Sequence, residues 1–211
     1  MKQLTMIVLA THNKGKIAEI SALLENQDII RPVVLKKLDD FGPMPDVVED
    51  GCTFDENAYK KASFYARILG FPCLADDSGL TVAALNGAPG VLSARYAGEN
   101  ASDEERSAKL LRAMEGQPDR KAAFECVLSF AVPTGPALTY EARCEGVITE
   151  QPMGANGFGY DPIFYYPPLK KTFAQLTREE KSRVSHRGQA LNEFKNEFDK
   201  VLAWLERLTP A

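Results

Sequence analysis

The sequence feature that most constrains the fold is a short apolar segment, residues 73–75, that runs directly into two adjacent carboxylates, Asp76 and Asp77. The apolar residues are typical of a buried strand, and we expect this strand to stop at Asp76. Because successive side chains of an extended chain point to opposite faces, the two carboxylates should have different roles. Gly79 permits a turn, which would present Asp77 and Ser78 at a strand end, where α/β proteins bind ligands. An acidic turn with an Asx-type hydrogen bond is the structural alternative.

The order of the predicted elements indicates the class of fold. Residues 5–10 form an apolar strand that a polar turn joins to a helix, and residues 29–35 are extended. Alternating apolar residues predict a hairpin of two long strands, at 124–132 and 137–149, and apolar residues at helical spacing predict one C-terminal helix over 191–205. Because strand–helix alternation gives way to a hairpin, we expect an α/β unit with a mixed sheet. Three capping boxes predict further helix starts, at Thr53, Ser102 and Thr177.

Length and charge narrow the classes of protein. With 211 residues, of which 45% are hydrophobic, the chain can bury one sizeable core, and we expect a single α/β domain over residues 1–211. The net charge is -4 and no tract is densely basic, which argues against nucleic acid as a partner. A bound phosphate would therefore belong to a small molecule.

Cysteine usage and the N-terminus indicate the compartment. The four cysteines form no Cys-x-x-Cys pair and no cluster with histidine, so neither a zinc site nor a redox motif is indicated. The apolar run near the N-terminus is too short for a signal sequence or a membrane span. We therefore expect a cytoplasmic protein with reduced thiols and no membrane partner.

The turn after the first strand has the character of an anion site. Residues 11–16, Thr-His-Asn-Lys-Gly-Lys, join a strand end to a helix N-terminus, where free N–H groups and the helix dipole favour negative charge. Lys14 and Lys16 add full positive charge. The turn is not a Walker A loop, because it lacks the leading glycine and the Lys-Ser/Thr pair. A solvated basic turn is the alternative to a phosphate site.

Acids and lysines also gather around the second predicted helix. Lys60 and Lys61 lie in its second turn, and Glu49 and Asp50 precede it. On their own, such lysines more often form a solvated helix face. Together with Asp77 they fit a site for magnesium and a triphosphate, because Mg²⁺ binds one or two carboxylates and takes its other ligands from water and phosphate oxygens.

A glycine-rich loop has the residue types of a purine site. Gly157 and Gly159 flank Phe158, so the backbone can approach a flat ligand on which the ring stacks. Asp161 is held by the proline that follows it and can accept a hydrogen bond from a ring N–H. A hairpin loop with packed aromatic residues is the structural alternative.

Residues 180–188 are rich in hydrogen-bond donors. Lys181, His186 and Arg187 can all donate, and Arg187 is permanently charged. Only two histidines occur in the chain, and one of them lies beside this arginine. A structural helix cap at Ser185 accounts for part of the pattern.

Six stretches of the chain resemble the motifs of the inosine triphosphate pyrophosphatase family, in the family's order. They extend from the first strand to the last helix. His12 departs mildly, because relatives often have glycine or serine there. The stretches are Ala10-Thr11-x-Asn13-x-x-Lys16, Thr53-Phe54-x-Glu56-Asn57-Ala58-x-x-Lys61-Ala62, Ala75-Asp76-Asp77-Ser78-Gly79-Leu80, Gly87-Ala88-Pro89-Gly90-Val91-x-Ser93-Ala94-Arg95-Tyr96, Gly157-Phe158-Gly159-Tyr160-Asp161-Pro162 and Glu180-Lys181-x-x-x-Ser185-His186-Arg187-Gly188.

The resemblance implies a reaction and an architecture. The family hydrolyses deaminated purine nucleoside triphosphates, such as ITP, dITP and XTP, to the nucleoside monophosphate and pyrophosphate. The resemblance further implies Mg²⁺ as cofactor and a homodimer. It also implies a long central sheet flanked by helices, with two lobes and the active site in the cleft between them.

The resemblance also assigns roles to residues. Asp77 and Lys61 would be catalytic, with Asp77 the base for the attacking water, and Glu49 and Asp77 would bind Mg²⁺. Ser78 would contact the substrate. The phosphates would be held by Thr11, His12, Asn13, Lys14, Gly15, Lys16 and Lys61. The base would be held by Phe158, Gly159, Tyr160, Asp161, Lys181, His186 and Arg187.

Base selection has a physical reason that is independent of the family. Hypoxanthine and xanthine have a 6-oxo acceptor and an N1–H donor, whereas adenine has a 6-amino donor and a bare N1. A site with a cationic donor at the 6-position and a carboxylate at N1 leaves the groups of adenine unpaired. Guanine shares the 6-oxo and N1–H pair, so its rejection must come from the 2-position.

Two other functions fit parts of the sequence. A nucleotide-binding regulator without catalysis would tolerate loss of Glu49, Lys61 or Asp77, and all three are present. A pyrophosphatase of the related fold that acts on modified pyrimidine nucleotides is disfavoured by the pair at 186–187. The catalytic purine hypothesis is therefore preferred.

Overall fold

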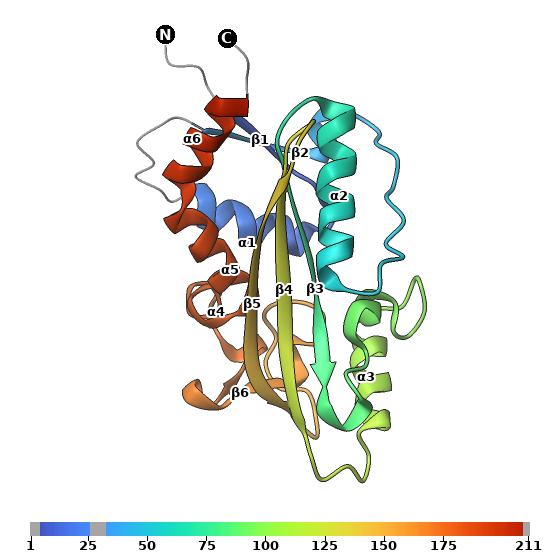
Figure 1. Cartoon of the computed structure of the whole chain (residues 1–211). Helices are drawn as coiled ribbons and strands as arrows, with labels where there is room; N and C mark the ends of the chain where they lie inside the picture. The colour runs from blue at the N-terminus through green and yellow to red at the C-terminus, as the bar shows by residue number, and fades with distance from the viewer. Residues whose placement is uncertain (1–4, 26–32, 209–211) are drawn as a thin grey trace.

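A seven-stranded sheet runs through the computed structural model of the protein, which describes residues 5–25 and 33–208 (Figure 1). The strand order is β2-β1-β3-β4-β5-β6-β7. The strands are β1 (Thr5–Leu9), β2 (Val33–Lys37), β3 (Cys73–Val82), β4 (Lys121–Ala131), β5 (Ala137–Ile148), β6 (Phe164–Tyr166) and β7 (Lys171–Thr172). The α-helices are α1 (Lys14–Glu25), α2 (Phe54–Leu69), α3 (Asp103–Ala113), α4 (Arg178–Val184), α5 (His186–Asn196) and α6 (Phe198–Leu208).

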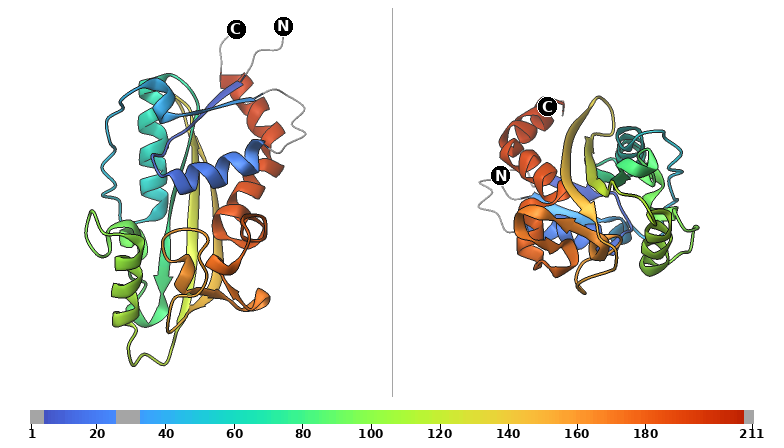
Figure 2. Two further views of the ribbon diagram at one scale, coloured as in Figure 1. Left: turned by 180° about the vertical axis from the view of Figure 1, so that it is seen from behind. Right: turned by 90° about the horizontal axis from the view of Figure 1, so that it is seen from below.

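The sheet is mixed, as the sequence predicts. β1 pairs in parallel with β2 and β3, and the pairs from β3–β4 to β6–β7 are antiparallel. The long strands β3, β4 and β5 lie side by side along the length of the molecule (Figure 1). Helices cover both faces of the sheet: α2 lies on one face, and α1, α5 and α6 lie on the other (Figure 2).

Strand β3 divides its side chains between the two faces. Leu74 belongs to the core with α1, α5 and α6, whereas Cys73 and Ala75 belong to the core under α2. Because side chains alternate along a strand, Asp76 continues the face of Leu74 and Asp77 continues the face of Ala75. The prediction that the two carboxylates point to opposite faces is confirmed by their separate sets of partners.

The prediction that the central strand stops at Asp76 is wrong. β3 continues to Val82 and pairs with β4 along its whole length. Backbone hydrogen bonds to a long antiparallel neighbour do not require apolar side chains, so the polar residues do not end the strand. The element that does end here is β1, which pairs with β3 only at residues 8 and 9. The carboxylates therefore lie just beyond the end of a neighbouring strand.

The predicted turn at Gly79 is also wrong, and a close contact explains this glycine instead. A Cβ at Gly79 would lie 2.5 Å from the carbonyl oxygen of Gly90 and 2.5 Å from Oγ of Ser93. Both belong to the 3₁₀ helix η3 (Gly90–Arg95), and Ser93 Oγ accepts the N–H of Leu80 at 2.9 Å. The missing side chain allows η3 to pack directly on β3.

The three predicted helix starts are confirmed. In each, the hydroxyl of the capping residue accepts an N–H from the residue three positions later at 3.1 Å. The boxes at Ser102 and Thr177 are reciprocal, whereas the carboxylate of Glu56 in the first box accepts the N–H of Cys52 instead. The caps satisfy N–H groups that a helix leaves unpaired at its start.

The prediction of one C-terminal helix is wrong, because α5 ends at Asn196 and α6 begins at Phe198. Both helices pack on the same core, so the apolar spacing continues across the bend and does not reveal it. Of the segment predicted to be extended, residues 33–35 lie in β2, and residues 29–32 lie outside the described residues. Within the described chain, no helix is long and apolar enough to cross a membrane.

Gly79→Ala should lower the thermal unfolding midpoint, because the new Cβ would overlap a backbone carbonyl of η3. Overpacking costs about 1–3 kcal/mol, which corresponds to a fall of about 2–12 °C for a chain of this size. Gly15→Ala is the matched control, since its Cβ would mainly meet the ring of Phe158, a side chain that can move. If both variants unfold at the same temperature, the packing explanation for Gly79 is wrong.

Candidate active site

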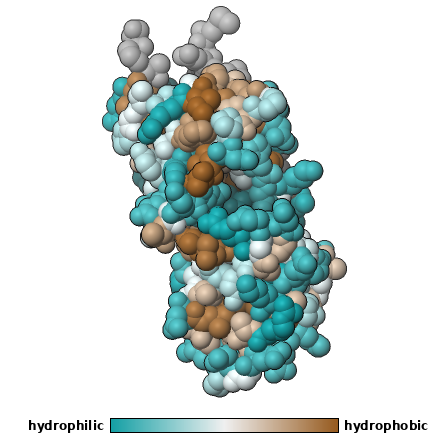
Figure 3. Space-filling view, turned by 90° about the vertical axis from the view of Figure 1, so that its right-hand side faces the viewer, coloured by the Kyte–Doolittle hydropathy of each residue, from teal (hydrophilic) through white to brown (hydrophobic). Residues whose placement is uncertain are grey.

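The site residues predicted from the sequence lie around one pocket of about 660 Å³, although they come from segments spread over the whole chain. A hollow lies midway along the molecule on the face shown in Figure 3, bordered by hydrophilic side chains and by a few hydrophobic ones. The predicted residues that line the pocket are Thr11, His12, Asn13, Lys14, Gly15, Lys16, Glu49, Lys61, Asp77, Ser78, Phe158, Gly159, Tyr160, Asp161, Lys181, His186 and Arg187. Lining residues to which the sequence analysis assigned no role in a site include Asp46, Tyr65, Arg95, Asp103, Arg106 and Phe124.

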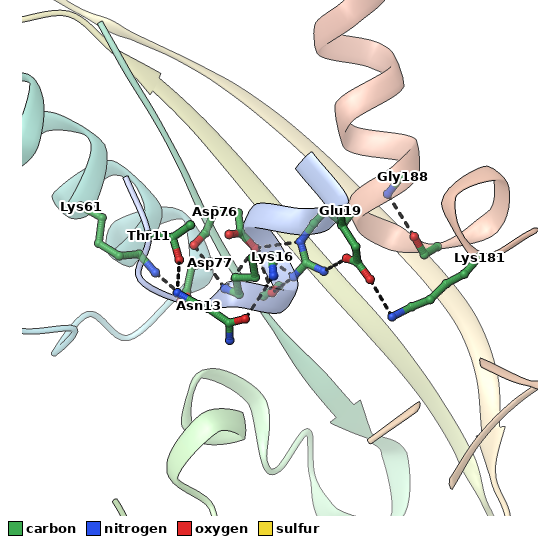
Figure 4. Close-up of polar contacts among 12 residues, drawn as sticks. Thr11, Asn13, Lys16, Glu19, Lys61, Asp76, Asp77, Lys181 and Gly188 are labelled. Atoms are coloured by element: carbon green, nitrogen blue, oxygen red, sulfur yellow. Dashed lines mark hydrogen bonds and ion pairs between the residues drawn. The ribbon is translucent and has the colours of Figure 1, made fainter. Parts of the chain in front are cut away.

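The turn between β1 and α1 presents a helix N-terminus to the pocket. Asn13 Oδ1 accepts the N–H of Lys16 at 3.1 Å, and Thr11 Oγ1 accepts the N–H of Asn13 at 3.2 Å (Figure 4). The helix begins at Lys14, inside the predicted turn, so Gly15 and Lys16 belong to its first turn. Because the first N–H groups of a helix have no partner within it, this turn is suited to bind an anion.

Asp76, which the sequence analysis includes in no ligand site, is fully buried among cationic partners. Its Oδ2 accepts hydrogen bonds from Arg187 Nε at 3.1 Å and Nη2 at 3.0 Å, and lies 3.1 Å from Lys16 Nζ. Burial alone would raise the pKa of Asp76, but Lys16 and Arg187 outweigh it and hold the pKa far below the usual range. Asp76 is therefore a fixed anion that orients both cations.

Asp77 meets a different set of charges on the other face of β3. Lys61 Nζ lies 3.2 Å from Asp77 Oδ1 (Figure 4). It also lies 3.0 Å from Glu49 Oε2. Burial opposes the charge of Lys61, but Asp77 and Glu49 outweigh it and raise its pKa. Burial raises the pKa of Asp77, and the negative charges of Glu49 and Asp76 raise it further. The positive charge of Lys61 opposes this rise but does not cancel it.

The donor set around Asp77 is suited to a hard divalent cation. Asp77 Oδ2 is buried without a hydrogen-bond partner, and Glu49 contacts Lys61 through only one of its two oxygens. Residues 5–25 and 33–208 contain no group of three or more His, Cys, Asp or Glu side chains placed to hold a metal ion. Mg²⁺ needs no such group, because it binds through one or two carboxylates and keeps water or phosphate ligands. Glu49 and Asp77 therefore fit Mg²⁺ that is shared with a phosphate ligand.

Phe158 and Asp161 lie close to the first turn of α1. Asp161 Oδ2 accepts the N–H of Phe158 at 2.9 Å and a hydrogen bond from Lys181 Nζ at 2.6 Å. The same ammonium lies 4.7 Å from the centroid of the Phe158 ring, which also touches the space where Gly15 lacks a side chain. Burial raises the pKa of Asp161, against the opposing effect of Lys181.

Glu19 is a site residue that the sequence analysis missed. Its two oxygens contact Lys181 Nζ, at 2.8 Å, and Arg187 Nη1 (Figure 4). Burial would raise the pKa of Glu19, but Arg187 and Lys181 outweigh it and lower the pKa. Glu19 follows Lys16 by three residues on α1, so the two side chains are neighbours on the helix surface. This spacing from a predicted site residue could have indicated Glu19 from the sequence.

Arg187 has few donors left for a ligand. Its Nε and Nη2 groups donate to Asp76, Nη2 also donates to Ser78 Oγ at 2.7 Å, and Nη1 donates to Glu19. One N–H of Nη1 remains among its five donors. The residue therefore orients the site chiefly through its ion pairs, and its direct contact with the base stays a prediction.

His186 is buried against an aromatic ring. It stacks on Phe124 with ring centroids 4.7 Å apart and planes inclined by 10°, and its Nδ1 has no hydrogen-bond partner. Burial and the nearby Arg187 and Lys181 lower its pKa well below the usual range, so the ring is neutral at pH 7. The predicted cap at Ser185 is confirmed, because its side chain accepts the N–H of Gly188 at 3.1 Å.

Fold and site together define an α/β protein in which a helix N-terminus, a buried lysine–carboxylate cluster and an aromatic loop share one pocket. The chain belongs to the Ham1 family, whose model matches residues 7–197. This match confirms the family resemblance that the six motifs carry.

Relatives and solved structures agree with this assignment. The chain is 61% identical to the dITP/XTP pyrophosphatase of Syntrophobacter fumaroxidans, over 97% of this chain and 86% of that protein. It is 52% identical to the dITP/XTP pyrophosphatase of Geobacter sulfurreducens, over 89% of this chain and 94% of that protein. The structure of a HAM1 protein from Coxiella burnetii matches with a TM-score of 0.85 at 45% identity, covering 93% of this chain and 100% of that chain.

Asp76→Asn and Asp77→Asn should differ in stability, although the residues are adjacent. Loss of the Asp76 charge leaves Arg187 and Lys16 without their buried partner, and breaking such a pair costs about 3–5 kcal/mol. Burial raises the pKa of Asp77, and Lys61 keeps Glu49 as a partner when Asp77 loses its charge, so Asp77→Asn should lower the free energy of unfolding much less than Asp76→Asn does. Urea unfolding at pH 7 measures both, and equal losses would contradict these assignments.

Proposed function

We propose that the protein hydrolyses the deaminated purine nucleoside triphosphates ITP, dITP and XTP to the nucleoside monophosphate and pyrophosphate, and so removes them from the nucleotide pool. The relatives named dITP/XTP pyrophosphatase, which match nearly the whole chain, support this function. One observation carries it: the Lys61–Asp77 pair, a helix N-terminus and the Phe158–Asp161 loop line the same pocket. That combination suits a ligand with both a polyphosphate and a flat base.

In this proposal the first turn of α1 binds the triphosphate. The N–H groups at the start of the helix and the side chains of Lys14 and Lys16 face a polyanion with complementary charge. Lys16 forms an ion pair with Asp76, so its ammonium is held in place before the substrate binds. A preorganised cation stabilises developing charge without reorganisation during the reaction.

Hydrolysis proceeds by attack of water on the α-phosphorus and cleavage of its bond to the oxygen that bridges to the β-phosphate. Asp77 accepts the proton of the water, and its raised pKa brings it closer to the basicity that a general base needs. Lys61 keeps the carboxylates of Asp77 and Glu49 together and neutralises charge beside them. Glu49 and Asp77 would hold Mg²⁺, which when bound would neutralise further charge on the phosphate oxygens.

The base is selected by the loop that contains Phe158 and Asp161. Oδ2 of Asp161 is already used by Phe158 N–H and Lys181, which leaves Oδ1 to accept the N1–H of hypoxanthine or xanthine. Lys181 provides the cationic donor for the 6-oxo group. Adenine would place a bare N1 against the carboxylate and a 6-amino group against the ammonium, which costs it affinity.

The proposal also covers the oligomeric state, the class of partner and the location of the protein. The family resemblance supports a homodimer, and the net charge of -4 supports a small-molecule rather than a nucleic-acid partner. The scattered cysteines, which form no redox or zinc motif, support a cytoplasmic location with reduced thiols. Sedimentation or light scattering of the purified protein measures the oligomeric state directly.

Release of pyrophosphate from ITP, dITP, XTP, GTP and ATP tests the function. We expect fast release from the first three with magnesium present, and slow release from GTP and ATP, because the groups of adenine stay unpaired and guanine differs at the 2-position. Excess EDTA should stop the reaction, and added MgCl₂ should restore it. Equal rates with ITP and ATP, or orthophosphate as the first product, would contradict the proposal. Activity in excess EDTA would contradict the metal requirement.

Substitutions in the lysine–carboxylate cluster test the assigned roles. Asp77→Asn should abolish hydrolysis of ITP because the base is lost, and Lys61→Ala should reduce kcat/KM by the equivalent of about 2–4 kcal/mol, as for other electrostatic donors. Lys60→Ala is the matched control, because this neighbouring lysine is more exposed and pairs with Asp50. Steady-state kinetics measures the series. A loss for Lys60→Ala as large as that for Lys61→Ala would point to a general effect of charge.

A further inference from the structure

The loop Gly157–Asp161, which we propose binds the base, is also anchored by helix α3. The proposed mechanism does not use this helix. The N–H of Gly159 donates to Asp103 Oδ2 at 2.6 Å, and the carbonyl of Gly159 accepts from Ser107 Oγ at 3.4 Å. The backbone N–H and the carbonyl of Gly159 are thus both hydrogen-bonded to side chains in the first two turns of α3. The sequence analysis treated this helix start only as a capping box, and the cap itself is made by Ser102 and Glu105.

Asp103 is itself held in a fixed orientation. Its Oδ1 forms an ion pair with Arg106, which leaves Oδ2 for Gly159. Arg106 is fixed in turn, because its Nη1 donates to the carbonyl oxygens of Ala94 at 2.8 Å and Ala101 at 2.7 Å. The carboxylate therefore points at the loop with little freedom to turn away.

The loop needs an external anchor because of its glycines. Gly157 has a φ of 77° and Gly159 a φ of 64°, and glycine leaves this left-handed conformation at little cost. Phe158 lies between them and is only partly buried, whereas Tyr160 is buried and donates its hydroxyl to the carbonyl of Ser93 at 2.9 Å. Lys181 holds the Asp161 end of the loop. Asp103 holds the middle of the loop, directly after Phe158.

We propose that Asp103 is a positioning residue for base recognition, which fixes the Gly157–Asp161 loop so that Phe158 and Asp161 meet the purine together. The inference rests on the proposed function, because it takes the purine to bind at this loop. Asp103 contacts the loop backbone and Arg106, neither of which belongs to the proposed phosphate-binding turn of α1. Its loss should therefore weaken binding of the base and spare binding of the phosphate end.

Calorimetric binding of two products separates the two ends of the site. Asp103→Ala should weaken binding of inosine monophosphate about tenfold, the effect of one charge-assisted hydrogen bond, and leave binding of inorganic pyrophosphate unchanged. In steady-state kinetics with ITP, the loss should fall mainly on KM. Glu104→Ala is the matched control: it removes one negative charge from the same helix turn at an exposed position, so inosine monophosphate should bind as before.

Two further measurements separate positioning from a general loss of structure. Asp103→Asn keeps an acceptor for the N–H of Gly159 and should recover most of the affinity for inosine monophosphate. Amide hydrogen exchange of the free protein should be faster over residues 157–160 in Asp103→Ala and unchanged in Glu104→Ala. Unchanged exchange there, or equal weakening of inosine monophosphate and pyrophosphate, would overturn the proposal. Failure of the proposed function would instead show as no hydrolysis of ITP by the unchanged protein, whereas the exchange measurement does not depend on activity.

Discussion

The buried carboxylate of Asp76 joins three parts of the chain that are far apart in the sequence. It lies on β3 and pairs with Lys16 at the start of α1 and with Arg187 at the start of α5. Because water cannot replace these partners in the interior, loss of one leaves a charge uncompensated and is strongly unfavourable. The placement of the helix N-terminus relative to the Lys181–Arg187 segment therefore depends on this one group.

The same strand keeps two electrostatic environments apart by the alternation of its side chains. On the face of Asp76, Lys16 and Arg187 outweigh the effect of burial and lower the pKa of the carboxyl. On the face of Asp77, Glu49 adds a second acid beside a single lysine, and burial raises the pKa. Adjacent residues of the same type thus have opposite properties, one suited to hold cations in place and the other to accept a proton or share a metal ion.

The pocket brings together an anion-binding turn and a glycine-containing aromatic loop whose positions are set by contacts from elsewhere. The ring of Phe158 packs where Gly15 has no side chain, so the two ends of the site touch directly. Lys181 and Asp103 reach the loop from two different helices. A loop with left-handed glycines can bind a base selectively only if such contacts limit its conformations.

The sequence by itself determined what depends on neighbours along the chain: the helix caps, the alternating strands, the opposite faces of Asp76 and Asp77, and the motifs that carry the family resemblance. Tertiary structure alone decided that β3 continues through its polar residues, because β4 supplies the hydrogen bonds. It also decided the bend between α5 and α6 and the contacts of Glu19. Arg187 binds Asp76 across 111 positions of sequence. Local periodicity reflects the geometry of a few consecutive residues, whereas a buried charge finds its partner only when the folded chain brings distant segments together.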